Sequence, residues 1–91
     1  MIKLLLADDE PLVLVGLKSM LNWDEYGITI CGTARNGEQA LELIEKERPD
    51  LVIADIKMPL KTGLEVMEEC NKSTARVHFL LSLQVLKSVN I

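Results

Sequence analysis

Long apolar runs are missing from this sequence of 91 residues. Its unbroken apolar stretches, such as Leu4–Ala7, are far shorter than the roughly 20 residues that a membrane-spanning helix needs. A secretory signal peptide is missing too, because the short apolar start is followed at once by Asp8, Asp9 and Glu10. These absences predict a cytoplasmic protein with no membrane partner.

Cysteine and excess positive charge are also scarce. Cys31 and Cys70 are the only cysteines, and in a reducing compartment two buried thiols are a simpler interpretation than a disulfide. Ten basic residues against fourteen acidic ones give a net charge of -4, which is a poor match to DNA or to an anionic membrane. Contact with DNA is therefore expected only through an effector domain outside these residues.

The sequence does contain a regular series of short β-type runs. They begin near Ile2, Ile28, Leu51 and Val77, at separations of 26, 23 and 26 residues. This spacing fits repeated strand and helix units, so it predicts an α/β fold with a doubly wound parallel sheet. At about 25 residues per unit the chain holds about three and a half units, and we predict one partial domain over residues 1–91.

Apolar residues at helical spacing fill the gaps between these runs. The predicted helices run from Pro11 to Leu21, from Gly37 to Glu47, and onward from Thr62. Two capping-box patterns, Asn36 with Gln39 and Thr62 with Glu65, mark the second and third helix starts. The residues expected to face inward in the third helix are Leu64, Val66, Met67 and Cys70.

The last twenty residues differ in composition from the rest. All fourteen acidic residues lie within residues 1–71, whereas residues 72–91 carry a net charge of +3. We interpret Val77–Ser82 as a fourth strand followed by a short helical segment, although its apolar spacing also fits a helix. His78 is expected to be a core or edge residue of that strand, because no carboxylate or cysteine lies beside it in sequence.

Three carboxylates stand at predicted strand ends. Asp8 and Asp9 follow the first strand, and Asp55 closes the third. Binding sites in parallel sheets lie beyond these ends, so we expect the three to meet around one Mg²⁺, a cation that prefers oxygen ligands. Asp55, expected to be exposed, suits a nucleophile toward phosphorus, and a backbone carbonyl of Ile56–Lys57 is a further candidate ligand. The simpler alternative is that Asp9 or Glu10 merely caps the first helix.

Segments around these carboxylates resemble the receiver domain of two-component response regulators. The resembling segments are Leu4–Glu10, Leu51–Pro59 and Thr62–Glu65, within residues 1–71. The resemblance implies a flavodoxin-like receiver fold, with Asp55 accepting a phosphoryl group from a sensor histidine kinase. It also implies that Mg²⁺ is held by Asp8, Asp9, Asp55 and the backbone carbonyl of Lys57. A weaker resemblance, to receivers of AraC-type transcription regulators, lies in Pro11, Gly16, Trp23 and Gly27–Ile28.

The same family uses a hydroxyl and a lysine at the ends of later strands. Ser82 lies 27 residues after Asp55 and is the candidate hydroxyl, although an ordinary tail serine is an equally good interpretation. The lysine has no counterpart, because Lys87 comes too early. Helix four, strand five and helix five are not found in these residues. Apolar surface and an open sheet edge would then be exposed, so we expect a homo-oligomer.

Two other functions remain as alternatives. One is a phosphorylation-impaired fragment that acts only by self-association. The other is a Mg²⁺-dependent phosphohydrolase of the haloacid-dehalogenase kind, which also uses a strand-end aspartate as its nucleophile. That class has a second acid two places later, as Glu10 follows Asp8, but its downstream lysine and acidic pair are not evident. The favoured prediction is therefore a signalling switch and not an enzyme.

Overall fold

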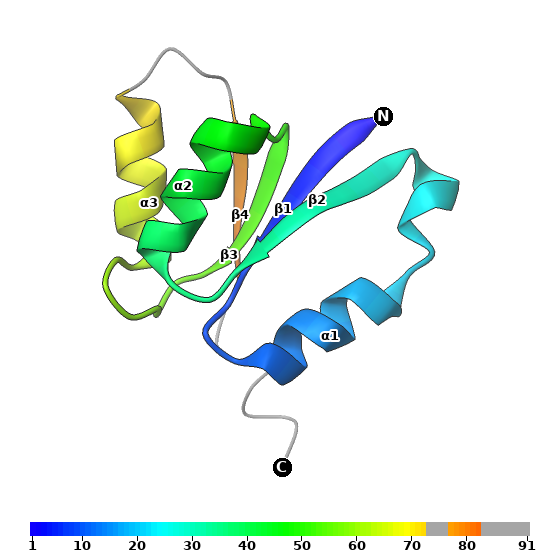
Figure 1. The fold of residues 1–91 in the computed structure, drawn as a ribbon, viewed down its shortest axis with the longest axis horizontal. Coiled ribbons are helices and arrows are strands. Elements are labelled where there is room, and N and C mark those ends of the chain that lie inside the picture. The colour runs from blue at the N-terminus through cyan, green and yellow to red at the C-terminus, as the bar shows by residue number, and fades with distance from the viewer. Residues whose placement is uncertain (73–76, 83–91) are drawn as a thin grey trace.

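The computed structural model describes residues 1–72 and 77–82 of the chain, in which strands and helices alternate (Figure 1). The elements are β1 (Ile2–Ala7), α1 (Pro11–Met20), a 3-10 helix (Trp23–Tyr26), β2 (Ile28–Ala34), α2 (Gly37–Glu47), β3 (Leu51–Asp55), α3 (Gly63–Asn71) and β4 (His78–Ser82). The helical segment predicted after the fourth strand lies outside the described residues, as does Lys87. None of the described helices has the length and apolar character of a membrane span.

The four described strands form one parallel sheet in the order β2-β1-β3-β4. The register pairs Ala7 with Ala54 across β1 and β3, and Asp55 with Ser82 across β3 and β4. Parallel strands point the same way, so the carboxyl ends of β1, β3 and β4 meet at one end of the sheet. The predicted parallel α/β architecture is confirmed.

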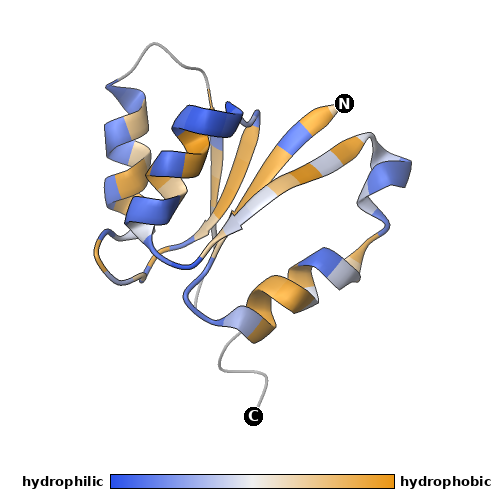
Figure 2. Ribbon diagram, viewed as in Figure 1, coloured by the Kyte–Doolittle hydropathy of each residue, from blue (hydrophilic) through white to orange (hydrophobic). Residues whose placement is uncertain are grey.

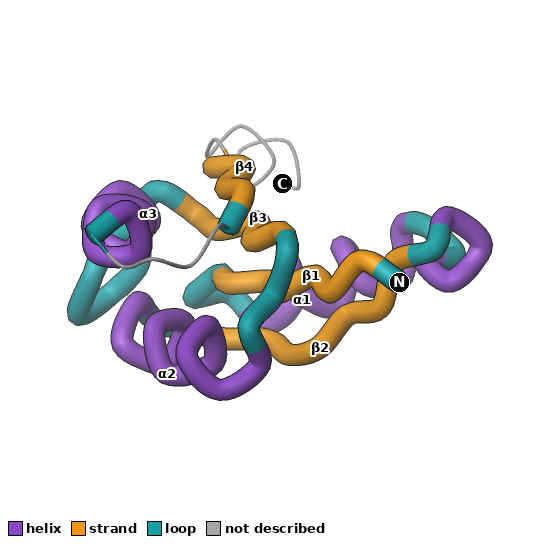
Figure 3. The backbone as a smooth tube through the Cα atoms, turned by 90° about the horizontal axis from the view of Figure 1, so that it is seen from above, coloured by secondary structure: helices purple, strands orange, loops and turns teal. Residues whose placement is uncertain are grey.

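Helices cover both faces of this sheet, as Figure 3 shows from above. Side chains alternate between the two faces along each strand. Leu4 and Leu6 of β1 pack with Leu14 of α1, whereas Leu5 and Ala7 face α2 and α3. The larger core cluster comprises Leu5, Ala7, Ala34, Ala40, Ile44, Val52, Ala54, Met58, Val66 and Cys70. Because both faces of β1 are covered, the strand is almost continuously apolar.

The helices differ from the prediction in two details. Helix α1 ends at Met20, one residue earlier than expected. Leu64, expected to face inward, is 44% exposed. Two residues along a helix turn the side chain through about 200°, so Leu64 lies opposite Val66, which is fully buried. Figure 2 shows the resulting pattern, with hydrophobic residues concentrated along the strands and polar residues along much of α2 and α3.

Cys31 and Cys70 form no disulfide, as predicted. Cys70 of α3 is buried, whereas Cys31 of β2 is only partly buried, so the expectation of a buried thiol is confirmed for Cys70 alone. Burial is the main cause that raises the pKa of both thiols above their ordinary value of 9.0. Both are therefore protonated at neutral pH, and neither is an activated nucleophile.

Candidate functional site

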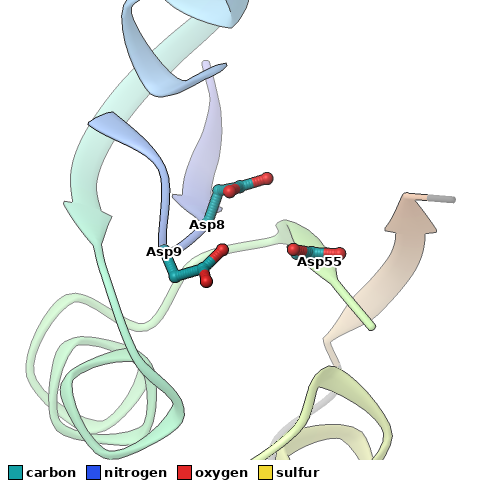
Figure 4. Close-up of side chains that lie close together, drawn as sticks. All are labelled: Asp8, Asp9 and Asp55. Carbon is teal, nitrogen blue, oxygen red and sulfur yellow. The ribbon is translucent and has the colours of Figure 1, made fainter. Parts of the chain in front are cut away.

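Asp8, Asp9 and Asp55 come together at the carboxyl end of the sheet. Asp8 directly follows β1, and its backbone N–H continues the pairing with β2 by donating to the carbonyl of Ala34 at 3.0 Å. Asp55 is the last residue of β3, the strand next to β1. Each of the three residues offers a carboxylate oxygen within 4.8 Å of the other two, and Figure 4 shows the three side chains gathered around one space. The predicted convergence is confirmed.

Burial differs among the three carboxylates. Asp8 and Asp55 are 2% and 1% exposed, whereas Asp9 is partly exposed. The expectation that Asp55 is an exposed carboxylate was wrong, because Asp55 closes an inner strand flanked by β1 on one side and β4 on the other. The cluster therefore has a buried floor of two carboxylates and a more open side at Asp9.

Short backbone turns hold the two buried carboxylates in place. The N–H of Glu10 donates to Asp8 Oδ1 at 2.9 Å, and the N–H of Lys57 donates to Asp55 Oδ1 at 3.4 Å. In both cases the donor stands two residues after the aspartate, as in an Asx turn. The same local device thus turns the chain away from each strand and fixes one oxygen of each carboxylate.

The capping alternative fails for the first helix. Glu10 occupies the N-cap position of α1, and its backbone carbonyl accepts the N–H groups of Val13 and Leu14 at 3.1 and 3.3 Å. Its side chain makes no capping hydrogen bond to α1. Asp9 precedes that position and is therefore not the N-cap residue of this helix.

The loop between β3 and α3 has an unusual backbone. Leu60 has a φ of 70°, a left-handed conformation that a side chain disfavours. The N–H of Lys61 donates to the carbonyl of Pro59 at 2.8 Å, which closes a three-residue turn around Leu60. The N–H of Gly37, the first residue of α2, donates to the same Pro59 carbonyl at 3.3 Å. The loop that follows Asp55 is thus tied to the start of α2.

A pocket of about 430 Å³ opens between these loops, on the side of Asp9. It is lined by Asp9, Arg35, Asn36, Gln39, Pro59 and Leu60. Three connections that follow β1, β2 and β3 therefore contribute to its walls. Of the three aspartates, Asp9 is the one that lines this pocket, next to side chains of mixed polar and apolar character.

Other candidate residues have clear places in the fold. Ser82 ends β4 in register with Asp55. Lys57 is exposed, and the contact that links it to Asp55 is through its N–H. His78 begins the edge strand β4 at the opposite end of the sheet, so it is an edge residue as predicted. Sequence reasoning did not single out Gly37 or Leu60; the Asn36-Gly37 pair at a helix start was the one signal for the first, and nothing marked the second.

An acidic cluster of this kind suits a hard divalent cation. Three clustered carboxylates repel one another, and a cation that prefers oxygen ligands relieves that repulsion. The donor set therefore fits Mg²⁺, which takes one or two carboxylates together with water and phosphate oxygens.

Comparisons with known proteins agree with the fold and the cluster. The family model of the response regulator receiver domain matches residues 4–83. The chain is 38% identical over 82 residues to an uncharacterized response regulatory protein of Staphylococcus epidermidis, covering 90% of this chain and 33% of that protein. It is 38% identical over 81 residues to the uncharacterized transcriptional regulatory protein YesN of Bacillus subtilis, covering 89% of this chain and 22% of YesN.

Solved structures give the same result. The REC domain of AraT, a response regulator from Geobacillus stearothermophilus, superimposes with a TM-score of 0.85 at 28% identity, covering 96% of this chain and 70% of that one. The chain spans a third or less of the length of the two sequence relatives. On the strength of the matched segment, the acidic cluster and the fold, the chain belongs to the response regulator receiver domain family.

Proposed function

We propose that Asp55 accepts a phosphoryl group from the phosphohistidine of a sensor histidine kinase. An oxygen of the Asp55 carboxylate forms a bond to phosphorus while the P–N bond of the donor breaks. The imidazole leaves with the bonding electron pair and takes up a proton from solvent, and the product is an aspartyl phosphate. The observation that carries this proposal is the meeting of Asp8, Asp9 and Asp55 within 4.8 Å at the ends of adjacent strands.

The same proposal assigns roles to the neighbouring groups. Asp8, Asp9, Asp55 and the backbone carbonyl of Lys57 would hold Mg²⁺, which when bound offsets negative charge on the phosphoryl oxygens. The turn at Glu10 orients Asp8, and the turn at Lys57 orients Asp55. The Ser82 hydroxyl would contact the phosphoryl group, and the support for this role is its register with Asp55 at the end of β4.

Phosphoryl uptake tests the proposal directly. The protein is incubated with Mg²⁺ and acetyl phosphate and measured by intact-mass spectrometry. We expect the added mass of one phosphoryl group, lost in Asp55→Asn and retained in the matched control Asp50→Asn, whose aspartate lies at the other end of the sheet. Uptake by Asp55→Asn would refute the assignment, and release of many phosphates per protein would favour the hydrolase alternative.

The output of the receiver is a second part of the proposal. Among the relatives, YesN and HptR are named transcriptional regulatory proteins, and this chain spans 22% and 27% of their lengths. We propose that residues 1–91 form a partial receiver domain of such a regulator, and that an AraC-type effector domain makes the DNA contact. Gene regulation is therefore expected to require the longer protein.

Self-association is proposed on the basis of the α1 face. Leu12 and Val15 of α1 are 83% and 58% exposed, and Leu80 of β4 is 58% exposed. Leu80 pairs with Ile53, which packs on the α1 side of the sheet, and β4 is the edge of the described sheet. Apolar side chains beside a sheet edge favour association. Sedimentation velocity at micromolar concentration should give a dimer or larger species, which Leu80→Glu weakens; a monomeric wild type contradicts the proposal.

A further inference from the structure

The start of α2 presses directly on the loop that follows Asp55. Gly37, the first residue of α2, is buried, and a Cβ built on it would overlap the backbone carbonyl and the Cβ of Lys61. Contacts with backbone atoms cannot be relieved by rotating a side chain. The φ of Gly37 is not in the left-handed region, so its conformation does not require a glycine. The close approach of the Lys61 backbone does require one.

Three hydrogen bonds and this contact fix the loop between β3 and α3. The Pro59 carbonyl accepts N–H groups from Lys61 and from Gly37, which belong to different connections. Nearer to Asp55, the carbonyl of Ile56 accepts the N–H of Gly63 at 2.9 Å. The loop is therefore closed at its base by the bond between Ile56 and Gly63. At its tip, Pro59–Lys61, it is held against Gly37 of α2, and we call this contact the clamp.

The conformation held by the clamp is a strained one. Leu60, at the tip, is 68% exposed and has little packing of its own to keep it at a φ of 70°. Non-glycine residues stay in such conformations only where the surroundings determine them. The Gly37 contact supplies that determination from outside the loop.

We propose that Gly37 is a positioning residue for the phosphorylation site. Its missing side chain lets α2 hold the Pro59–Lys61 turn, and this turn fixes the path of the chain from Asp55 through Lys57. The inference deepens the proposed function, because it makes the connection between β2 and α2 part of the support for the Mg²⁺ ligands at Asp55 and Lys57.

The test compares Gly37→Ala with Gly16→Ala. Gly16 lies inside α1, and a Cβ there would meet nothing within 4 Å, so this control adds the same methyl group without a clash. Amide hydrogen exchange is measured on the metal-free proteins. In Gly37→Ala we expect the amides of Lys61 and Gly63 to exchange about ten-fold faster, while the amide of Asp8, bonded to Ala34, is unchanged.

Calorimetric titration with MgCl₂ gives the second measurement, at a temperature where the variants are folded. The dissociation constant for Mg²⁺ should rise about ten-fold in Gly37→Ala and stay at the wild-type value in Gly16→Ala. A merely structural role would lower the melting temperature and leave the Mg²⁺ affinity of the folded protein unchanged. That result, or unchanged exchange of the two loop amides, overturns the proposal.

If Gly37→Ala does not fold, Lys61→Gly carries the test. It removes the Cβ against which Gly37 packs and adds no atom, so it should accelerate the same two amides and weaken Mg²⁺ binding in the same direction. Wild-type behaviour in both measurements overturns the proposal. The exchange measurement needs neither metal nor phosphate, so failure of Asp55 to become phosphorylated would count against the proposed function and not against the clamp.

Discussion

The two ends of the sheet use carboxylates in opposite ways. At the amino end, Asp50 and Lys3 form two hydrogen bonds, both 2.8 Å long. The N–H of Lys3 donates to the side-chain oxygen Oδ2 of Asp50, and the N–H of Asp50 donates to the Lys3 carbonyl. The Lys3 ammonium lies 3.7 Å from the Glu47 carboxylate and also contacts the Glu47 carbonyl. His78 adds an N–H bond of 3.0 Å to the Asp50 carbonyl. Both Asp50 and Glu47 thus take part in contacts with Lys3.

At the carboxyl end, three aspartates lie within 4.8 Å of one another. Backbone N–H groups donate to Asp8 and Asp55, but they carry no full positive charge. We therefore expect repulsion among the three carboxylates to lower the stability of the metal-free fold, and the contacts with Lys3 at the amino end to raise it. The difference indicates that the amino end holds β1, β3 and β4 together, whereas the acidic cluster at the carboxyl end fits the proposed Mg²⁺ site. Removing one negative charge should therefore change stability in opposite directions at the two ends.

The largest effect is expected from Asp9→Asn. This change removes a proposed Mg²⁺ ligand. The dissociation constant for Mg²⁺ should therefore rise about ten-fold or more. It also removes repulsion on Asp8 and Asp55, and because Asp9 is partly exposed the metal-free protein should gain only about 1 kcal/mol. Urea unfolding with EDTA, and again with MgCl₂, measures both quantities.

Metal-linked stability provides the control for Asp9→Asn. A ligand that binds only the folded state raises the free energy of unfolding as its concentration exceeds the dissociation constant. Wild-type protein should therefore be stabilised by MgCl₂ at concentrations that leave Asp9→Asn unaffected. Equal stabilisation of the two proteins by MgCl₂, or a loss of stability in the metal-free variant, would contradict the proposal that the carboxyl end of the sheet holds a Mg²⁺ site.

A smaller effect of opposite sign is expected from Asp50. Asp50→Ala removes the acceptor of the Lys3 N–H, and since this bond is solvent-exposed the loss should be about 1 kcal/mol. Asp50→Asn keeps an acceptor but loses the charge, so it should destabilise less. Both variants should bind Mg²⁺ as the wild type does, because Asp50 lies at the other end of the sheet. A stability gain in Asp50→Asn would break the comparison between the ends.

Much of the fold could be predicted because its signals are local. The starts of β1 and β2 and both bounds of α2 match the prediction, since an apolar run or a capping pattern marks each of them. Asn36 accepts the N–H of Gln39 at 2.8 Å, as the capping pattern implied. The acidic cluster was predictable too, because the parallel sheet places the residues after neighbouring strands side by side.

Features set by tertiary contacts could not be predicted. The burial of Asp55 depends on which strands flank β3, and the sequence gives no strand order directly. The left-handed Leu60 contradicts its own side-chain preference and depends on contacts from α2. Leu64 was misplaced because two inward positions were assigned two residues apart on one helix. In each case the missing information lies in another segment of the chain.

The smallest effect is expected at a residue that lies at the functional end but has a structural role. Thr62 caps α3: its hydroxyl accepts the N–H of Glu65 at 3.1 Å, and Glu65 Oε1 accepts the N–H of Thr62 at 3.0 Å. Thr62→Ala should cost about 1 kcal/mol in urea unfolding and leave the Mg²⁺ dissociation constant unchanged. A weakened Mg²⁺ affinity would show that this cap also supports the site.

The pH dependence of this cap gives a finer test of the same point. Hydrogen bonds from Thr62 lower the pKa of Glu65 below its ordinary 4.5. A carboxyl group with a lowered pKa in the folded state stabilises the fold above its unfolded pKa, and that contribution is lost as the pH falls through the lowered value. Glu65→Gln should therefore lower the melting temperature at pH 7 but not in strong acid. The matched change at the exposed Glu68 of the same helix should show no such pH-dependent difference from wild type, since Glu68 is not part of the capping box. A similar pH dependence in both variants would mean that general helix charge, and not the capping box, is responsible.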